Sequence, residues 1–288
     1  MFKGAYVAIV TPFKNGKIDE KKFAELVEFQ IKNGMDGIVP VGCTGEAATF
    51  SHDEQKHLMK LTCEIVNKRV PVVAGAGSNN TAEAVDLTKY AKKAGCRGAL
   101  SIMPYYNKPT PEGQYRHYEA IAKSADIPIM IYNVPSRTGI SMKPETVARL
   151  SSIENITAIK EASGSLDQVS QILAMCDITV LSGDDSLTLP MMAVGAQGVV
   201  SVVANIIPKE VRDMTASFLE GDIEAAKALH YKILPLSKAM FIETNPIPVK
   251  ISMKLLGRLN GEFRLPLCEM EKPNEEKLKK TLKNYGLL

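Results

Sequence analysis

Lys160 is the residue whose position points most directly to chemistry, namely imine formation on a ketone. It lies in an apolar, strand-like segment, residues 156–162. Strict alternation along that segment predicts that Ile156, Ala158 and Lys160 share one face. If that face points into a dry interior, desolvation lowers the pKa of the amine, and the neutral amine attacks a ketone to form an electron-withdrawing imine. The residues alone leave two alternatives open, a structural lysine paired with Glu161 or another carboxylate and a phosphate-binding lysine.

Polar residues at the ends of other predicted strands could assist such a reaction. Tyr132 ends the preceding strand, where its phenol could transfer protons during imine formation. Arg137 offers a guanidinium fork to a substrate carboxylate, although it could instead pair with a surface acid at the rim. The turn at residues 42–45 leads into a helix, so its backbone N–H groups and the Thr44 hydroxyl could hold a small carboxylate. Two further candidates for a proton relay end other strands, Cys43 and Tyr106.

Motifs for metal, nucleotide and hydrolase chemistry are incomplete. Asp184 and Asp185 could bind a divalent metal or hydrolyse a glycoside, but no third acidic strand end accompanies them. Asp185 is predicted to cap a helix instead. Gly75 and Gly77 begin a dinucleotide-binding pattern that Asn80 leaves incomplete, and the sequence lacks Walker A, GxSxG and HExxH patterns. We therefore predict neither a metal nor a dissociable cofactor.

Eight strand-and-helix units are predicted to position these residues. Apolar, β-branched runs begin near residues 5, 37, 70, 98, 128, 156, 178 and 198, and a helical pattern follows each run. Successive runs begin 20 to 33 residues apart, about the length of one strand plus its crossover helix. The pattern predicts an α/β fold, a (β/α)8 TIM barrel whose reacting groups come from the C-terminal ends of the strands. Ser51 and Glu54 form a capping box that opens one of the helices.

The strand pattern stops after residue 205. Four helical patterns follow, at residues 208–219, 223–240, 249–256 and 275–284. The first of these can complete the barrel as its eighth helix. We therefore predict a catalytic barrel over residues 1–220 and a C-terminal helical domain, residues 221–288, packed on it.

The composition of the 288-residue chain excludes several classes of protein. Its 45% hydrophobic and 23% charged residues are typical of a globular chain. The net charge is only +3, and the basic residues are spread among acidic ones, which argues against a nucleic-acid partner. No apolar run reaches the ~18 residues of a membrane span, and the five cysteines include no CxxC pair. These features predict a soluble, cytoplasmic protein with reduced thiols and no membrane partner.

Eight segments that carry these residues resemble one family, in order and over almost the whole chain. They are residues 42–46, 74–79, 104–109, 132–139, 159–162, 182–185, 198–202 and 245–250. The chain resembles the pyruvate-dependent class I aldolase family that contains dihydrodipicolinate synthase and N-acetylneuraminate lyase. The resemblance implies condensation of pyruvate with L-aspartate 4-semialdehyde to 4-hydroxy-tetrahydrodipicolinate, in the diaminopimelate and lysine pathway. The alternative is a sialic-acid or 2-keto-3-deoxy sugar-acid lyase of the same family.

The resemblance also implies roles for individual residues. Lys160 would form the imine with pyruvate, without any cofactor, and Tyr132 would donate and accept protons. Tyr106 would complete the relay from the neighbouring subunit of a tight dimer, and two such dimers would form a homotetramer. Arg137 would bind the carboxylate of the semialdehyde. Thr44 and the backbone near Val200 would hold pyruvate. Gly183, at the end of another strand, would also bind substrate.

Two features depart from the usual pattern of the family. Cys43 stands where a threonine hydroxyl usually links the two tyrosines of the relay, and a thiol is a weaker hydrogen-bonding group. A lysine-binding allosteric site, as in the lysine-inhibited members, is a hypothesis here, because Gln55 and Ala47 replace the histidine and serine of the enteric form. The positions that match this site are Ala47, His52, Gln55, Asn79, Glu83 and Tyr105.

Overall fold

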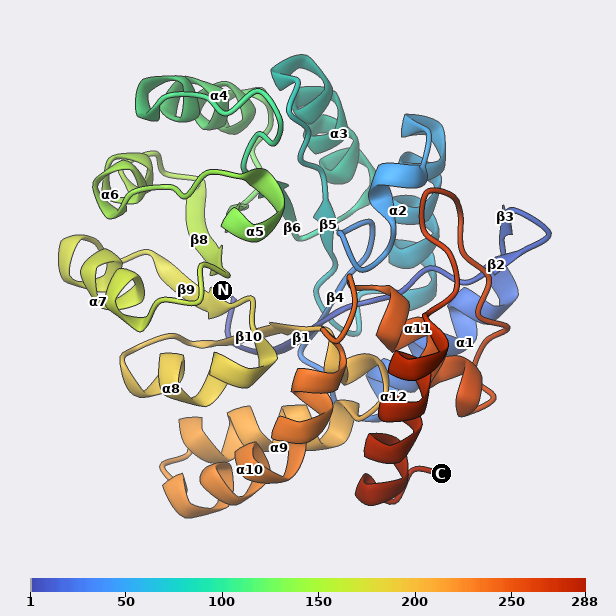
Figure 1. Cartoon of the computed structure of the whole chain (residues 1–288). Helices are drawn as coiled ribbons and strands as arrows, with labels where there is room; N and C mark the ends of the chain where they lie inside the picture. The colour runs from blue at the N-terminus through green and yellow to red at the C-terminus, as the bar shows by residue number, and fades with distance from the viewer. Residues whose placement is uncertain (1) are drawn as a thin grey trace.

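The predicted strand-and-helix units form a closed barrel in the computed structural model, which describes residues 2–288 (Figure 1). Its eight strands are all parallel, and they run in the order β4-β1-β10-β9-β8-β7-β6-β5. An isolated bridge between Ile38 and Val72 joins the two ends of this sheet. The strands are β1 (Gly4–Ala8), β4 (Gly37–Val39), β5 (Val73–Gly75), β6 (Gly98–Ile102), β7 (Ile129–Asn133), β8 (Ile156–Glu161), β9 (Thr179–Ser182) and β10 (Gly198–Ser201). The predicted (β/α)8 barrel is confirmed.

Helices surround this barrel and cover the outer face of its strands (Figure 1). They are α1 (Glu20–Lys32), α2 (His52–Val66), α3 (Thr81–Ala94), α4 (Pro111–Ser124), α6 (Pro144–Ser151), α7 (Leu166–Met175), α8 (Thr188–Ala193) and α9 (Pro208–Leu219). Four short helical segments lie in loops, η1 (Ala47–Thr49), α5 (Pro135–Thr138), η2 (Asp185–Leu187) and η3 (Val203–Asn205). Local sequence signals set several of these ends. The Ser51–Glu54 capping box opens α2, and Gly95 closes α3 in the left-handed conformation that glycine tolerates best.

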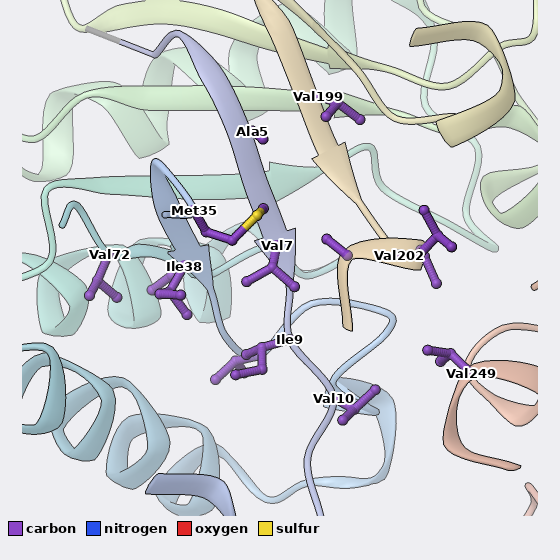
Figure 2. Close-up of a cluster of buried hydrophobic side chains, with 14 of the residues drawn as sticks. Ala5, Val7, Ile9, Val10, Met35, Ile38, Val72, Val199, Val202 and Val249 are labelled. Carbon is purple, nitrogen blue, oxygen red and sulfur yellow. The ribbon is translucent and has the colours of Figure 1, made fainter. Parts of the chain in front are cut away.

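The outer layer of the core lies between the strands and the helices. Side chains alternate between the two faces of each strand, so every second strand residue points outward. Figure 2 shows part of this layer, in which Val7, Ile38 and Val199 of three strands belong to one buried cluster. Val249, from the C-terminal helices, is buried in the same cluster. The barrel and its C-terminal helices therefore share one hydrophobic core.

The inner layer fills the barrel itself, and it includes Ala158, Leu181 and Val200. Lys160 lies two residues beyond Ala158 on the same strand. Ile156, which alternation had predicted on this face, is instead buried in the outer layer. The reason is an irregularity in the pairing of β7 with β8, where the register shifts and one residue is skipped.

Three helices follow the barrel, α10 (Ile223–Ala239), α11 (Ile247–Leu255) and α12 (Lys272–Tyr285). In Figure 1 α10 packs along α9, while α11 and α12 cross one side of the barrel. A two-stranded hairpin, β2 (Phe13–Lys14) and β3 (Lys17–Ile18), was not predicted because each strand is only two residues long. The division between residues 1–220 and 221–288 stays a prediction. None of the helices within residues 2–288 has the length and hydropathy to cross a bilayer.

Candidate active site

Lys160 lies inside the barrel on β8, directly opposite Tyr132 of β7. Its side chain is 5% exposed, and Nζ lies 4.2 Å from the centre of the Tyr132 ring. Gly183, at the end of β9, makes room for this side chain, because a Cβ there would lie only 3.0 Å from the Lys160 Cε and 2.7 Å from the Cβ of Ala162. The absence of a side chain at residue 183 thus allows the lysine to extend toward the strand ends.

Burial increases the fraction of the Lys160 amine that is neutral, and the neutral amine is the form that makes an imine. Desolvation, together with the positive charge of Arg137, lowers its pKa to about 8, although Cys43 and Asp185 oppose the shift. Glu161 does not pair with the lysine. Its carboxylate accepts hydrogen bonds from Asn133 Nδ2 at 3.0 and 3.1 Å and from other groups. Within the described part of the chain no carboxylate forms an ion pair with Lys160, so the structural-lysine alternative loses its proposed partner.

Tyr132 and Cys43 lie together at the mouth of the barrel. Tyr132 is 7% exposed, and burial raises the pKa of its phenol. The neighbouring Cys43 thiol raises that pKa further. Cys43 packs against the inner layer of the core. The phenol therefore stays protonated near neutral pH, and because a raised pKa makes it a weaker acid, it needs a partner in a relay to transfer protons.

Thr44 and Arg137 are joined by Asn245, a residue that the sequence analysis did not single out. The Asn245 side chain donates to Thr44 Oγ1 at 2.9 Å, and Arg137 Nη2 donates to the Asn245 carbonyl oxygen at 2.8 Å. Because Thr44 Oγ1 accepts that bond, its own hydroxyl proton remains free for a ligand. The Asn245 Oδ1 atom is buried and has no partner among residues 2–288. Arg137 forms no ion pair with any carboxylate in the same residues, so the alternative of a rim ion pair does not occur.

A cavity of about 530 Å3 opens at the C-terminal end of the barrel. Its wall includes Cys43, Tyr132, Arg137 and Asn245. The same wall carries five of the six candidate lysine-binding positions, Ala47, His52, Gln55, Glu83 and Tyr105. The sixth, Asn79, lies outside the wall and donates to the Tyr105 carbonyl oxygen at 3.2 Å. Of the remaining candidates, Lys160, Thr44, Gly183 and Val200 are not in the wall itself.

Tyr106 does not line this cavity. It follows β6 in a loop, where its side chain is 90% exposed and its backbone adopts a φ of 69°. A non-glycine residue in this left-handed region is strained. Because the aromatic ring is exposed to solvent, it adds no buried apolar surface to stabilise the fold. Within one chain, therefore, the structure assembles the predicted relay only as far as Tyr132 and Cys43.

A buried ion pair fixes the turn that carries Cys43 and Thr44. Glu46 follows these residues in a left-handed conformation with φ 61°, and its carboxylate contacts Lys250 Nζ of α11. Both side chains are 0% exposed. Desolvation raises the pKa of Glu46 and lowers that of Lys250, and their mutual attraction opposes both shifts. Both residues lie in the quoted motifs, but nothing in the sequence indicated that they meet.

The prediction that Asp185 caps a helix is wrong. Asp184 caps η2, because its side chain accepts from Ser186 N at 2.8 Å. Asp185 is buried, and its Oδ2 accepts from Val202 N and Val203 N at 2.9 Å each. The carboxylate therefore satisfies two N–H groups that the end of β10 leaves free. Neither aspartate belongs to a metal-ligating cluster within residues 2–288.

Fold and site together define a (β/α)8 barrel of the aldolase class with a buried lysine inside it. The family model described as the dihydrodipicolinate synthetase family matches residues 1–285. The chain belongs to this family.

Relatives match the whole chain. A curated protein from Geobacter sulfurreducens, named 4-hydroxy-tetrahydrodipicolinate synthase, is 58% identical over 100% of both chains. A crystal structure of a dihydrodipicolinate synthase is 52% identical over 100% of both chains, with a TM-score of 0.98.

Two solved relatives are described with ligands. The chloride-inhibited enzyme from Acinetobacter baumannii, complexed with pyruvate, is 42% identical over 100% of both chains, with a TM-score of 0.98. The enzyme from Cyanidioschyzon merolae with lysine bound is 41% identical, with a TM-score of 0.96, and the match covers 100% of this chain and 99% of the other.

Proposed function

We propose that this chain condenses pyruvate with L-aspartate 4-semialdehyde to 4-hydroxy-tetrahydrodipicolinate, a step of the diaminopimelate and lysine pathway. The observation that carries the proposal is the buried Lys160 amine, whose pKa is lowered to about 8, beside the Tyr132 phenol. Membership of the dihydrodipicolinate synthetase family and the names of full-length relatives support the choice of substrates.

The reaction needs only the lysine and groups that move protons. The Lys160 amine attacks the keto carbon of pyruvate, and loss of water gives the protonated imine. Loss of a methyl proton makes an enamine, whose carbon attacks the aldehyde carbon of the second substrate. The amino group of that substrate then displaces Lys160 from the imine carbon, which closes the ring and frees the enzyme. Tyr132 carries protons in these steps, with the Cys43 thiol as its neighbour in the relay.

The turn beside Lys160 binds the carboxylate of pyruvate. The Thr44 hydroxyl proton is free to donate, since its oxygen already accepts from Asn245. Backbone groups near Val200 complete this subsite, and Gly183 leaves room for the covalent adduct. A single lysine imine thus replaces any dissociable cofactor.

Arg137 selects the second substrate through its carboxylate. Replacement of Arg137 with alanine is expected to lower kcat/KM for aspartate semialdehyde about 100-fold, because a charged, two-point hydrogen bond is lost. Steady-state assays with both substrates measure this effect. Imine formation with pyruvate alone serves as the comparison and should fall far less, because Arg137 affects that step only through the Lys160 pKa and the Asn245–Thr44 contact. Unchanged semialdehyde kinetics, together with turnover of a sialic or 2-keto-3-deoxy sugar acid, would support the lyase alternative.

The rate of imine formation should follow the titration of Lys160. With a pKa of about 8, roughly a tenth of the amine is neutral at pH 7, against about one part in 3000 at the ordinary 10.5. Borohydride trapping of early pyruvate adduct should therefore rise about tenfold from pH 6 to pH 7 and level off near pH 9. A yield that still rises tenfold per pH unit up to pH 10 would show an unperturbed amine.

We propose that Tyr106 acts in the site of a second copy of the chain, within a dimer that pairs into a homotetramer. The exposed ring and the strained loop backbone support this proposal. Mixing and reassembling inactive Lys160→Ala chains with impaired Tyr106→Phe chains tests it. Activity returns only if one chain completes the other's site. Additive, unrescued activities would place Tyr106 in its own site, and light scattering would report the assembly.

The cavity wall also supports binding of L-lysine as an inhibitor. His52 Nε2 lies 3.7 Å from Glu83 Oε2, and both face the cavity, where they suit the charged groups of an amino acid. Inhibition that saturates at millimolar L-lysine is expected, and unchanged activity there would dismiss the proposal.

The five free cysteines support the proposed cytoplasmic location, which fractionation of cells would test.

A further inference from the structure

Two thiols outside the active site are in contact. Cys63 lies in the last turn of α2, and Cys96 follows Gly95 at the end of α3. Their Sγ atoms are 3.5 Å apart, close to van der Waals contact. Cys63 is partly exposed, whereas Cys96 is 7% exposed. The pair is thus accessible to a small solute from the side of Cys63 alone.

The surrounding structure keeps these two sulfur atoms together. Farther along the same helices, Lys56 Nζ lies 2.6 Å from Asp86 Oδ2, which joins α2 to α3 a second time. Cys96 occupies a short loop before β6, and the preceding Gly95 has a φ of 93°. A disulfide needs an S–S distance of about 2.05 Å, so the sulfurs must approach by roughly 1.5 Å. A loop residue beside a glycine can supply a movement of this size without disturbing the helix.

We propose that Cys63 and Cys96 are a modification site at which a peroxide forms a reversible disulfide between α2 and the end of α3. The Cys63 thiolate attacks one peroxide oxygen, so an S–O bond forms, the O–O bond breaks and the other oxygen leaves as water after protonation. The Cys96 sulfur then attacks the sulfenic sulfur, which forms the S–S bond and releases the second water. Overall, two thiols and one hydrogen peroxide give one disulfide and two waters.

The two cysteines have different parts in this reaction. A hydrogen bond from Cys96 lowers the pKa of Cys63, whereas that contact and burial raise the pKa of Cys96. Exposure and thiolate character therefore coincide at Cys63, which reacts first. Cys96 is the resolving thiol, held at contact distance and shielded from the oxidant.

The disulfide would brace one wall of the cavity. It closes a loop of 33 residues, the difference between positions 96 and 63. This loop contains β5 and α3, and α3 carries Glu83 in the cavity wall, while α2 carries His52 opposite it. Cross-linking a loop of this length restricts the unfolded chain and is expected to raise Tm by about 5 °C.

Peptide mapping of the oxidised full-length protein tests the proposal. Reduced protein is treated with hydrogen peroxide, remaining thiols are alkylated, and the chain is digested with trypsin without reductant. The expected product joins residues 61–68 to residues 94–97, at a mass about 2 Da below the sum of the two peptides. Oxidation of the exposed Cys268 in the same sample shows that the peroxide was effective. Fully alkylated Cys63 and Cys96 in that sample would overturn the proposal.

Single variants separate the two steps. Cys96→Ser should accumulate a sulfenic acid on Cys63 that dimedone traps, whereas Cys63→Ser should leave Cys96 unoxidised. Cys176→Ser is the matched control, because this partly buried thiol hydrogen-bonds to the Ile172 carbonyl and to neither Cys63 nor Cys96, and the variant should still form the cross-link. The Tm increase should vanish on reduction and be absent from Cys63→Ser. A cross-link without any Tm increase would refute the stabilisation that we expect from joining α2 to the end of α3.

Discussion

Replacing Lys160 with alanine is expected to lower kcat for pyruvate and aspartate semialdehyde by more than about 1000-fold, the largest effect on activity of any change in this chain. The buried amine is the atom that bonds to substrate, and its pKa of about 8 provides a usable neutral fraction near pH 7. Borohydride reduction in the presence of pyruvate should add about 72 Da to the peptide that contains Lys160, the mass of a reduced imine. The alanine variant should gain no such adduct.

Two controls make this result specific. Lys209→Ala removes an exposed lysine of α9 that pairs with Asp213, and it should leave both activity and adduct formation unchanged. The Lys160→Ala variant should also stay folded, since removing a buried amine that has no ion-pair partner relieves a desolvation cost. If the variant keeps a tenth of the parent activity, or if the adduct forms on another lysine, the imine assignment to Lys160 is wrong.

Replacing Lys250 with methionine is expected to reduce the free energy of unfolding by about 3–5 kcal/mol, the largest loss of stability. The change leaves the Glu46 carboxylate buried at 0% exposure without its cation, a situation that costs far more than loss of a surface pair. Urea unfolding measures the loss. Activity should fall as well, because Glu46 anchors the turn that carries Cys43 and Thr44 beside Tyr132.

The matched double variant shows whether the loss of stability comes from the unpaired Glu46 charge or from poor packing of the methionine. Adding Glu46→Gln to Lys250→Met removes the second charge, so much of the lost stability should return. Lys279→Met, which breaks the partly exposed pairs with Glu275 and Glu276, should cause no measurable loss. Equal destabilisation of the Lys250 single and double variants would show that methionine packing, rather than the charge on Glu46, caused the loss.

Local patterns in the sequence were sufficient to predict most of the fold. The helix predicted at residues 208–219 is α9 with the same bounds, and Ser51 caps α2 as its capping box indicated. Such signals depend on residues within one turn of each other, so they are readable without a fold. Alternation placed Lys160 inside the barrel but misplaced Ile156, because a shift in strand register depends on the neighbouring strand.

The sequence by itself determined which chemistry to expect, because a lysine in an apolar strand, a tyrosine one strand earlier and the motifs around them predict imine formation. Only the tertiary structure decided how the site is held. Asn245 reaches Thr44 across 201 residues, and Lys250 reaches Glu46 across 204. Contacts at such separations depend on how the barrel closes and where the C-terminal helices pack, and a single sequence carries no periodic signal for either. The Lys160 pKa follows from the same packing, because burial by distant segments sets its desolvation.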